Sequence, residues 1–198
     1  MMQQFMHGWK LMDSIIIDNF LEEELFYTLK NISYSDNIKW GTQVSNRSLS
    51  ECTSFDMGEM IYEKDNLVQL KNNEIIYNIF QKIITHIEVK AEGLFLGRAY
   101  FNRQKSTIDG CLHQDDGQYT ALLYVSDYEK EWGGFTQLWH SDSKQEYILP
   151  IPNRLVIFDA LTYHKGFGFS HVWNPERISL AFKINNIMNL AKAAFQNI

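Results

Sequence analysis

Two different spacings of apolar residues divide the chain. From residue 67 to residue 87, apolar side chains recur at intervals of three and four, which predicts a long helix with one buried face. From residue 94 to residue 184 the spacing changes to two, in short runs separated by turn sequences, which is typical of strands. The predicted strands are residues 94–103, 111–115, 119–126, 134–140, 146–149, 154–158, 163–168 and 177–184. Eight short, evenly spaced strands predict a double-sheet jelly roll with a cupin-like architecture.

The segments on either side of this strand region complete the predicted fold. Residues 14–20 predict a short strand, and residues 21–29 continue as an amphipathic helix with acidic residues in its first turn. Residues 34–66 are polar and irregular, and residues 188–195 predict a closing helix. We therefore expect a mainly β fold with flanking helices (α+β), in which N-terminal helices support a double-stranded β-helix core. The expected organisation is one domain over residues 1–198, with helical support at 14–93, the jelly-roll core at 94–185 and a C-terminal helix at 186–198.

Composition narrows the class of protein. With 45% hydrophobic residues, 14% aromatic residues and three prolines among 198 residues, the chain is typical of an ordered globular protein. A net charge of −6 disfavours nucleic acid as a partner. Cys52 and Cys111 give no disulfide framework, and the longest N-terminal apolar run, residues 15–17, is too short for a signal or a membrane span. A cytoplasmic location without membrane association is the expectation.

The most informative chemistry lies in the segment His113-Gln114-Asp115. Side chains alternate on a strand, so His113 and Asp115 point to the same face and supply two ligands from one short segment. His164, after the buried strand 154–158, is the best third ligand, and His140 and His171 are the alternatives. Two imidazoles and a carboxylate are the set that holds Fe(II) on one face and leaves the other positions open. The competing interpretation is that these histidines are hydrogen-bonded core residues without a metal.

A second group of polar residues is predicted to face the same interior. Thr120, Leu122 and Tyr124 share one face of their strand, and Arg177 opens the last strand. An arginine on the inner face of a barrel is costly unless an anion accompanies it, and a dicarboxylate would be such an anion. The alternative is a salt bridge between Arg177 and the nearby Glu176 or Asp159.

The order and separation of six motifs provide a further indication. They are His113-Gln114-Asp115, Tyr119-Thr120-Ala121-Leu122-Leu123-Tyr124-Val125, Trp132-Gly133-Gly134-Phe135-Thr136, Arg154-Leu155-Val156-Ile157-Phe158, His164, and Arg177-Ile178-Ser179-Leu180. Together they resemble the 2-oxoglutarate and Fe(II)-dependent oxygenase superfamily, and within it the prolyl 4-hydroxylase-like branch. Two departures stand out: the interval from His164 to Arg177 is longer than is usual, and Phe135 stands where many relatives carry a glutamate.

The resemblance implies roles for individual residues. His113, Asp115 and His164 would bind iron, and Arg177 with Tyr124 would bind the distal carboxylate of 2-oxoglutarate. Tyr100 matches a tyrosine that contacts the same co-substrate, and Gly133-Gly134 would form the turn at the barrel mouth.

The resemblance also implies an activity. The protein would use Fe(II), 2-oxoglutarate and O2, with ascorbate as an optional reductant, to hydroxylate an unactivated C–H bond and release succinate and CO2. A prolyl residue in a peptide or protein is the first expected substrate, a free amino acid or other small metabolite the second, and an alkylated nucleobase the third. The alternatives are a cupin-like metalloenzyme that uses no keto acid and a non-catalytic binding module. A halogenase is disfavoured because Asp115 occupies the position that a halide would need.

Overall fold

The structure is a computed structural model that describes residues 13–38, 40–43, 55–63, 73–87, 93–141, 143–170 and 176–187. These residues form two α-helices, a short 3-10 helix and antiparallel strands. The helices are α1 (Glu23–Ser33), α2 (Asn73–Ile84) and η1 (Lys130–Trp132). The strands are β1 (Ile15–Ile17), β2 (Trp40–Gln43), β3 (Phe55–Glu63), β4 (Leu94–Gln104), β5 (Tyr119–Tyr124), β6 (Thr136–Ser141), β7 (Lys144–Ile148), β8 (Leu155–Asp159), β9 (Tyr163–Gly166) and β10 (Arg177–Asn186).

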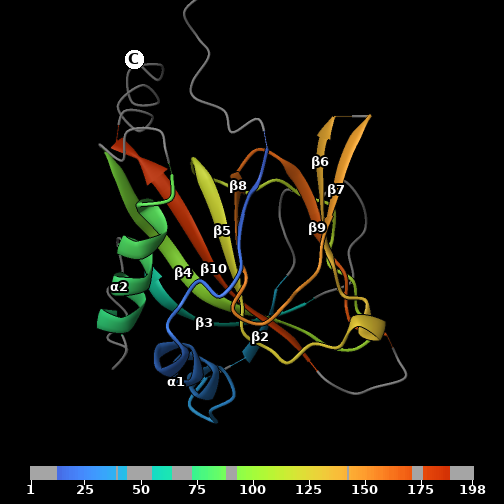
Figure 1. Cartoon of the computed structure of the whole chain (residues 1–198), viewed down its shortest axis with the longest axis horizontal. Helices are drawn as coiled ribbons and strands as arrows, with labels where there is room; N and C mark the ends of the chain where they lie inside the picture. The colour runs from blue at the N-terminus through green and yellow to red at the C-terminus, as the bar shows by residue number, and fades with distance from the viewer. Residues whose placement is uncertain are drawn as a thin grey trace, which may run out of the picture.

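The strands are arranged in two sheets. The larger sheet has the order β1-β8-β5-β10-β4-β3-β2, and the smaller has the order β7-β6-β9. In Figure 1 the two helices lie on one side of the larger sheet, and β6, β7 and β9 lie on the other side. The predicted fold class, a mainly β jelly-roll core with supporting helices, is confirmed.

Alternation along β10 shows how the larger sheet serves two different environments. Ile178, Leu180 and Phe182 belong to the main core, into which α1 and α2 also pack buried apolar residues. Arg177 and Lys183, which point the other way, are also buried but lie on the face directed towards the smaller sheet. One face of the strand therefore stabilises the fold, while the other presents polar groups to an interior pocket.

A second, smaller apolar cluster fills part of the space between the sheets. It consists of Tyr100, Leu122, Tyr124, Leu138, Ile148, Val156, Phe158 and Ala181. This cluster separates the two sheets and flanks the polar pocket.

The structure corrects several predicted elements. Residues 34–66 are not wholly irregular, because they contain β2 and β3, which add two strands to the larger sheet by pairing with each other and with β4. These strands lack a clear alternation of apolar residues and depend on backbone pairing with distant segments. Residues 111–115 form an isolated bridge at His113 rather than a strand. The predicted helix over 67–87 is observed as Asn73–Ile84, and β10 extends through Asn186. Residues 67–72 and 188–198, and hence most of the predicted C-terminal helix, lie outside the described residues.

Two further observations bear on the sequence predictions. Cys111 is buried and disulfide-bonded, which the sequence analysis did not expect, and Cys52 lies outside the described residues. In the part of the chain that the structure describes, neither helix has the length and apolar character needed to cross a bilayer.

Candidate metal and co-substrate site

Backbone pairing brings His113 and His164 together from distant parts of the sequence. The amide of each residue donates to the carbonyl of the other, at 3.0 and 2.9 Å, so His113 continues the smaller sheet beside β9. The two imidazole rings consequently lie with their centroids 4.2 Å apart. This position depends on main-chain hydrogen bonds, which hold both side chains without requiring a metal.

Asp115 completes the group. Its amide donates to the carbonyl of Ala160 at 2.8 Å, which anchors the segment to the end of β8. Its carboxylate oxygens lie 3.6 Å from Nε2 of His113 and 3.3 Å from Nε2 of His164. The candidate ligand atoms of the three residues all lie within 4.8 Å of one another, which suits coordination of one metal ion.

A backbone carbonyl lies beside Nδ1 of each imidazole. Nδ1 of His113 lies 2.9 Å from the carbonyl oxygen of Cys111, and Nδ1 of His164 lies 2.9 Å from that of Thr162. In the neutral ring, Nδ1–H donates to each carbonyl, and the Nε2 lone pair is left for a cation. Burial, reinforced by the neighbouring His164, lowers the pKa of His113 to about 4, so this ring is neutral at pH 7.

Neither of the alternative third ligands joins this group. His140, at the end of β6, lies 3.1 Å from a carboxylate oxygen of Glu146 instead. His171 lies outside the described residues. Among the three candidates, His164 is the one that the structure places beside His113 and Asp115.

Asp115 also has partners on the larger sheet. One of its carboxylate oxygens accepts a hydrogen bond from the hydroxyl of Thr120 at 2.6 Å and pairs with the ammonium group of Lys183. Burial would raise the pKa of Asp115, but Lys183 and His164 outweigh it, so the pKa lies well below its ordinary value. The carboxylate is therefore charged, and Thr120 and Lys183 fix its orientation.

Arg177 is buried at the other end of the same pocket. Its three nitrogens donate to the carbonyl of Gly134 at 2.7 Å, to the side-chain oxygen of Gln104 at 2.6 Å and to the hydroxyl of Thr136 at 2.6 Å. All three acceptors are neutral. Burial lowers the pKa of Arg177, but a guanidinium stays charged at neutral pH. In the described part of the chain this cation has no carboxylate partner.

The proposed salt bridge of Arg177 with Glu176 or Asp159 is accordingly wrong. A carboxylate oxygen of Glu176 lies 3.7 Å from a guanidinium nitrogen of Arg103. The carboxylate of Asp159 accepts a hydrogen bond from the backbone amide of Leu161. Tyr124 is adjacent to Arg177 as expected: the guanidinium lies 5.1 Å from the centre of its ring, and its hydroxyl donates to Thr136. A buried arginine without an acid favours an anionic ligand.

The Gly133-Gly134 turn supports Arg177. Both glycines have positive φ values, 70° and 72°, as their predicted place in a turn requires. A Cβ atom at Gly134 would overlap the ring of Phe169, whereas one at Gly133 would meet no atom within 4 Å. The backbone at Gly134 thus approaches the barrel closely and offers its carbonyl to Arg177.

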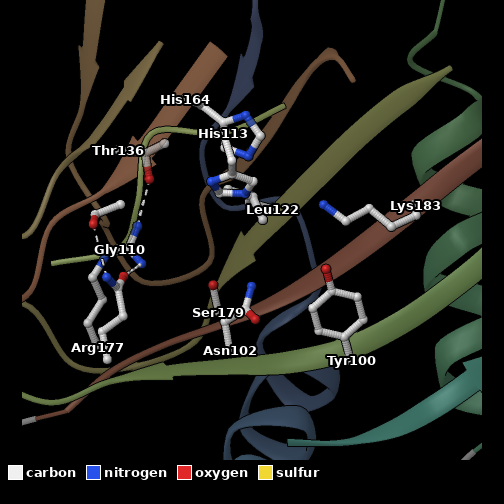
Figure 2. A pocket seen from close by; sticks show the side chains of 12 residues that line it. Tyr100, Asn102, Gly110, His113, Leu122, Thr136, His164, Arg177, Ser179 and Lys183 are labelled. Carbon is white, nitrogen blue, oxygen red and sulfur yellow. Dashed lines mark hydrogen bonds between the residues drawn. The ribbon is translucent and has the colours of Figure 1, made fainter. Parts of the chain in front are cut away.

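These groups line or adjoin one pocket, whose empty space of about 540 Å³ includes open solvent. Figure 2 shows the two imidazoles between Arg177 on one side and Lys183 on the other. The residues that line the pocket are Tyr100, Asn102, Gln104, Gly110, His113, Leu122, Thr136, His164, Gly166, Arg177, Ser179 and Lys183.

Comparison with known proteins is informative at the level of structure. No protein-family profile and no curated protein matches the sequence. Among solved structures, an oxidoreductase of the 2OG-Fe(II) oxygenase family from Burkholderia pseudomallei superposes with a TM-score of 0.69 at 13% identity, over 87% of this chain and 84% of that one. A prolyl-4-hydroxylase from Pseudomonas putida gives 0.62 at 14%, over 87% and 92%. A prolyl hydroxylase from Trichoplax adhaerens, solved with a hypoxia inducible factor peptide fragment, gives 0.61 at 15%, over 85% and 82%.

The chain has the 2OG-Fe(II) oxygenase fold. The TM-scores of 0.61 to 0.69 establish the architecture, whereas identities of only 13 to 15% leave the activity to be argued from the site.

The residues of this oxygenase fold suit a divalent first-row metal. The group offers two imidazole nitrogens and one carboxylate from one side, which matches a facial set of ligands. Both imidazoles have the backbone hydrogen bonds that fix metal-binding histidines, and Asp115 has its own hydrogen-bond partners.

Tyr100 lies in the pocket but on the Lys183 side of the imidazoles. Its ring centre is 5.9 Å from the ammonium of Lys183, and Figure 2 shows its hydroxyl directed towards the pocket. Its expected contact with the co-substrate remains a prediction.

Sequence reasoning missed several residues of the pocket. Lys183 continues the inward alternation of Arg177, Ser179 and Ala181 by one further step, so the pattern contained it. Asn102 and Gln104 similarly continue the inward face of β4 from Tyr100. Asn102 lies directly opposite Ser179 of β10, and Gln104 lies directly opposite Arg177. Knowledge of the strand register would have identified both residues.

Proposed function

We propose that the protein is a non-haem Fe(II)- and 2-oxoglutarate-dependent dioxygenase that hydroxylates an unactivated C–H bond and releases succinate and CO2. His113, Asp115 and His164 would hold Fe(II). Arg177, with Tyr124 beside it, would bind the distal carboxylate of 2-oxoglutarate. One observation carries the proposal: the candidate ligand atoms of His113, Asp115 and His164 lie within 4.8 Å of one another, beside a pocket that also holds a buried arginine without an acidic partner among the described residues.

When bound, Fe(II) supplies the redox chemistry that couples decarboxylation of 2-oxoglutarate to oxidation of a C–H bond. The protein supplies position and shelter. The carbonyls of Cys111 and Thr162, which contact Nδ1 of the two imidazoles, would leave Nε2 of each ring available to the metal. Arg177 is already fixed by three neutral acceptors, so binding a carboxylate there requires little reorganisation.

Two classes of substrate have support. A prolyl residue in a peptide is supported by the likeness to the Pseudomonas putida and Trichoplax adhaerens prolyl hydroxylases, the latter solved with a peptide. A free amino acid or another small carboxylic acid is supported by the ammonium group of Lys183 inside the pocket.

Replacing Arg177 tests the proposal against a cupin-like metalloenzyme that uses no keto acid. In Arg177→Met we expect the Kd for 2-oxoglutarate to rise at least about 30-fold, because a charge-assisted contact with a carboxylate is lost. The Kd for Co(II), a redox-stable substitute for Fe(II), should stay within about threefold, which also shows that the variant is folded. Isothermal titration of the metal-loaded protein measures both affinities.

Arg154→Met is the matched control, because Arg154 pairs with Asp18 outside the pocket. It should leave both affinities unchanged. Unchanged 2-oxoglutarate affinity in Arg177→Met would favour the keto-acid-independent alternative.

A further inference from the structure

Lys183 is a buried cation that orients the carboxylate of Asp115 and is not needed to bind 2-oxoglutarate in the proposed function. Lys183 is 4% exposed. Its ammonium group forms an ion pair with the carboxylate of Asp115 and lies 3.4 Å from the hydroxyl of Thr120. In the register of the larger sheet, Lys183 stands directly opposite Thr120. A buried ammonium group requires polar partners, and in the metal-free protein Asp115 and Thr120 provide them.

The place of Lys183 separates it from the co-substrate position. Arg177 and Lys183 lie on the same face of β10, six residues and therefore about 20 Å apart along the strand. Their long side chains approach the imidazoles from opposite sides (Figure 2). A co-substrate bound at Arg177 would leave the Lys183 side, with Tyr100, for a second ligand.

The charges of the pocket indicate what that ligand carries. A divalent metal and a dianionic co-substrate cancel each other. Among the described residues that line or ligate the site, the two cations, Arg177 and Lys183, then outnumber the one carboxylate, Asp115. Arg98, opposite Lys183 on β4, is already paired with Asp116. One positive charge remains in a buried pocket, and such a charge is stable when an anion accompanies it.

We infer that the primary substrate presents a carboxylate to the ammonium group of Lys183, an inference that rests on the proposed function. Before the metal binds, Asp115 is the counter-ion of Lys183. Once a metal shares that carboxylate, the substrate carboxylate takes over part of the pairing, and the hydroxyl of Tyr100 lies on the same side. The side-chain oxygen of Asn102, which is buried without a hydrogen-bond partner among the described residues, would accept a hydrogen bond from a donor group elsewhere on the substrate. The substrate is then a small free carboxylic acid rather than an internal prolyl residue, whose carboxyl group is a neutral amide.

Isosteric acid and amide probes test this inference. The protein is loaded with Co(II) and saturated with N-oxalylglycine, an unreactive analogue of 2-oxoglutarate, and the visible Co(II) spectrum is followed. The probes are acetate, isobutyrate, cyclopentanecarboxylate and benzoate, their four primary amides, and N-acetyl-L-prolinamide as a mimic of a peptide. We expect at least one acid to bind at least 10-fold more tightly than its amide and than the prolinamide.

Variants assign the preference to Lys183. Lys183→Met should reduce the acid-to-amide ratio to less than twofold, whereas Lys144→Met, which removes a lysine paired with Asp13 on the surface, should preserve it. Lys183→Gln provides a second, polar replacement if Asp115 does not tolerate methionine. Equal binding of acids and amides, binding of the prolinamide alone, no binding of any acid, or an unchanged ratio in both Lys183 variants would overturn the inference. If Co(II) or N-oxalylglycine failed to bind, the proposed function would fall as well.

Discussion

At the scale of single residues, the candidate metal site depends on which histidine accompanies His113 and Asp115. His164→Ala should weaken Co(II) binding at least about 100-fold, because one of three protein ligands is lost. His140→Ala is the matched control, since His140 contacts Glu146 and lies outside the group. Isothermal titration of the metal-free protein gives both affinities. If His140→Ala lost the metal and His164→Ala retained it, the assignment of the third ligand would be wrong.

The environment of His113 predicts how the metal-free protein responds to pH. Its pKa is about 4 in the folded state against 6.5 for the free side chain, so the unfolded chain binds more protons between these values. Above about pH 6.5 His113 therefore leaves the free energy of unfolding unchanged. As the pH falls from 6.5 towards 4, His113 lowers the free energy of unfolding progressively. Between pH 7 and pH 5 the loss is about 2 kcal/mol.

Urea unfolding of the metal-free wild type and of His113→Gln at both pH values isolates this contribution. The difference in unfolding free energy between the two proteins should shift by about 2 kcal/mol against the wild type at the lower pH. A difference that stays the same at pH 7 and pH 5 would show that His113 is not buried as a neutral ring.

The residues that sequence could and could not predict differ in one respect. His113, Asp115 and Arg177 were identified because their residue types in that order carry chemistry by themselves. Lys183 was not, because a lysine six positions further along the same strand is ordinary unless the pocket is known to reach it. Its contact with Asp115 depends on the register of β10 against β5, which the pattern of apolar residues does not specify.

At the scale of elements, the turn at Gly133-Gly134 connects the fold to the co-substrate position. Gly134→Ala combines a positive φ with overlap on Phe169, so it should both destabilise the protein and displace the carbonyl that holds Arg177. Gly133→Ala has the positive φ alone and should cost about 1 to 3 kcal/mol.

Thermal unfolding and 2-oxoglutarate titration compare the two variants. Gly134→Ala should weaken 2-oxoglutarate binding at least about 10-fold more than Gly133→Ala does. Of the two glycines, Gly134 is the one whose carbonyl accepts a hydrogen bond from Arg177. Equal effects on binding would mean that the backbone at Gly134 does not position the guanidinium.

Elements were predictable where their own sequence determines their environment. β10 alternates between polar and apolar residues over much of its length, β8 is a nearly continuous apolar run, and α2 has a regular apolar face, so their existence followed from the pattern. β2 and β3 did not follow, since they are strands through pairing with β4. The segment 111–115 was expected as a strand and is a single bridge, yet His113 and Asp115 still reach one site because the carbonyls of His164 and Ala160 anchor them.

At the scale of the whole molecule, the architecture explains why so little sequence identity suffices for the fold. The helices cover one face of the larger sheet with apolar residues, which many sequences can provide, whereas the opposite face carries the polar groups of the pocket. The solved neighbours share the architecture at 13 to 15% identity. Function must therefore be tested on the polar face of the sheet.

Anaerobic titration of the Fe(II)-loaded protein with 2-oxoglutarate tests the central claim most directly. The account predicts a visible metal-to-ligand charge-transfer band that saturates at one equivalent, followed by succinate formation when O2 is admitted, and loss of both signals in Asp115→Ala. Iron binding without the band and without succinate would contradict the account and would leave the buried charge of Arg177 unexplained.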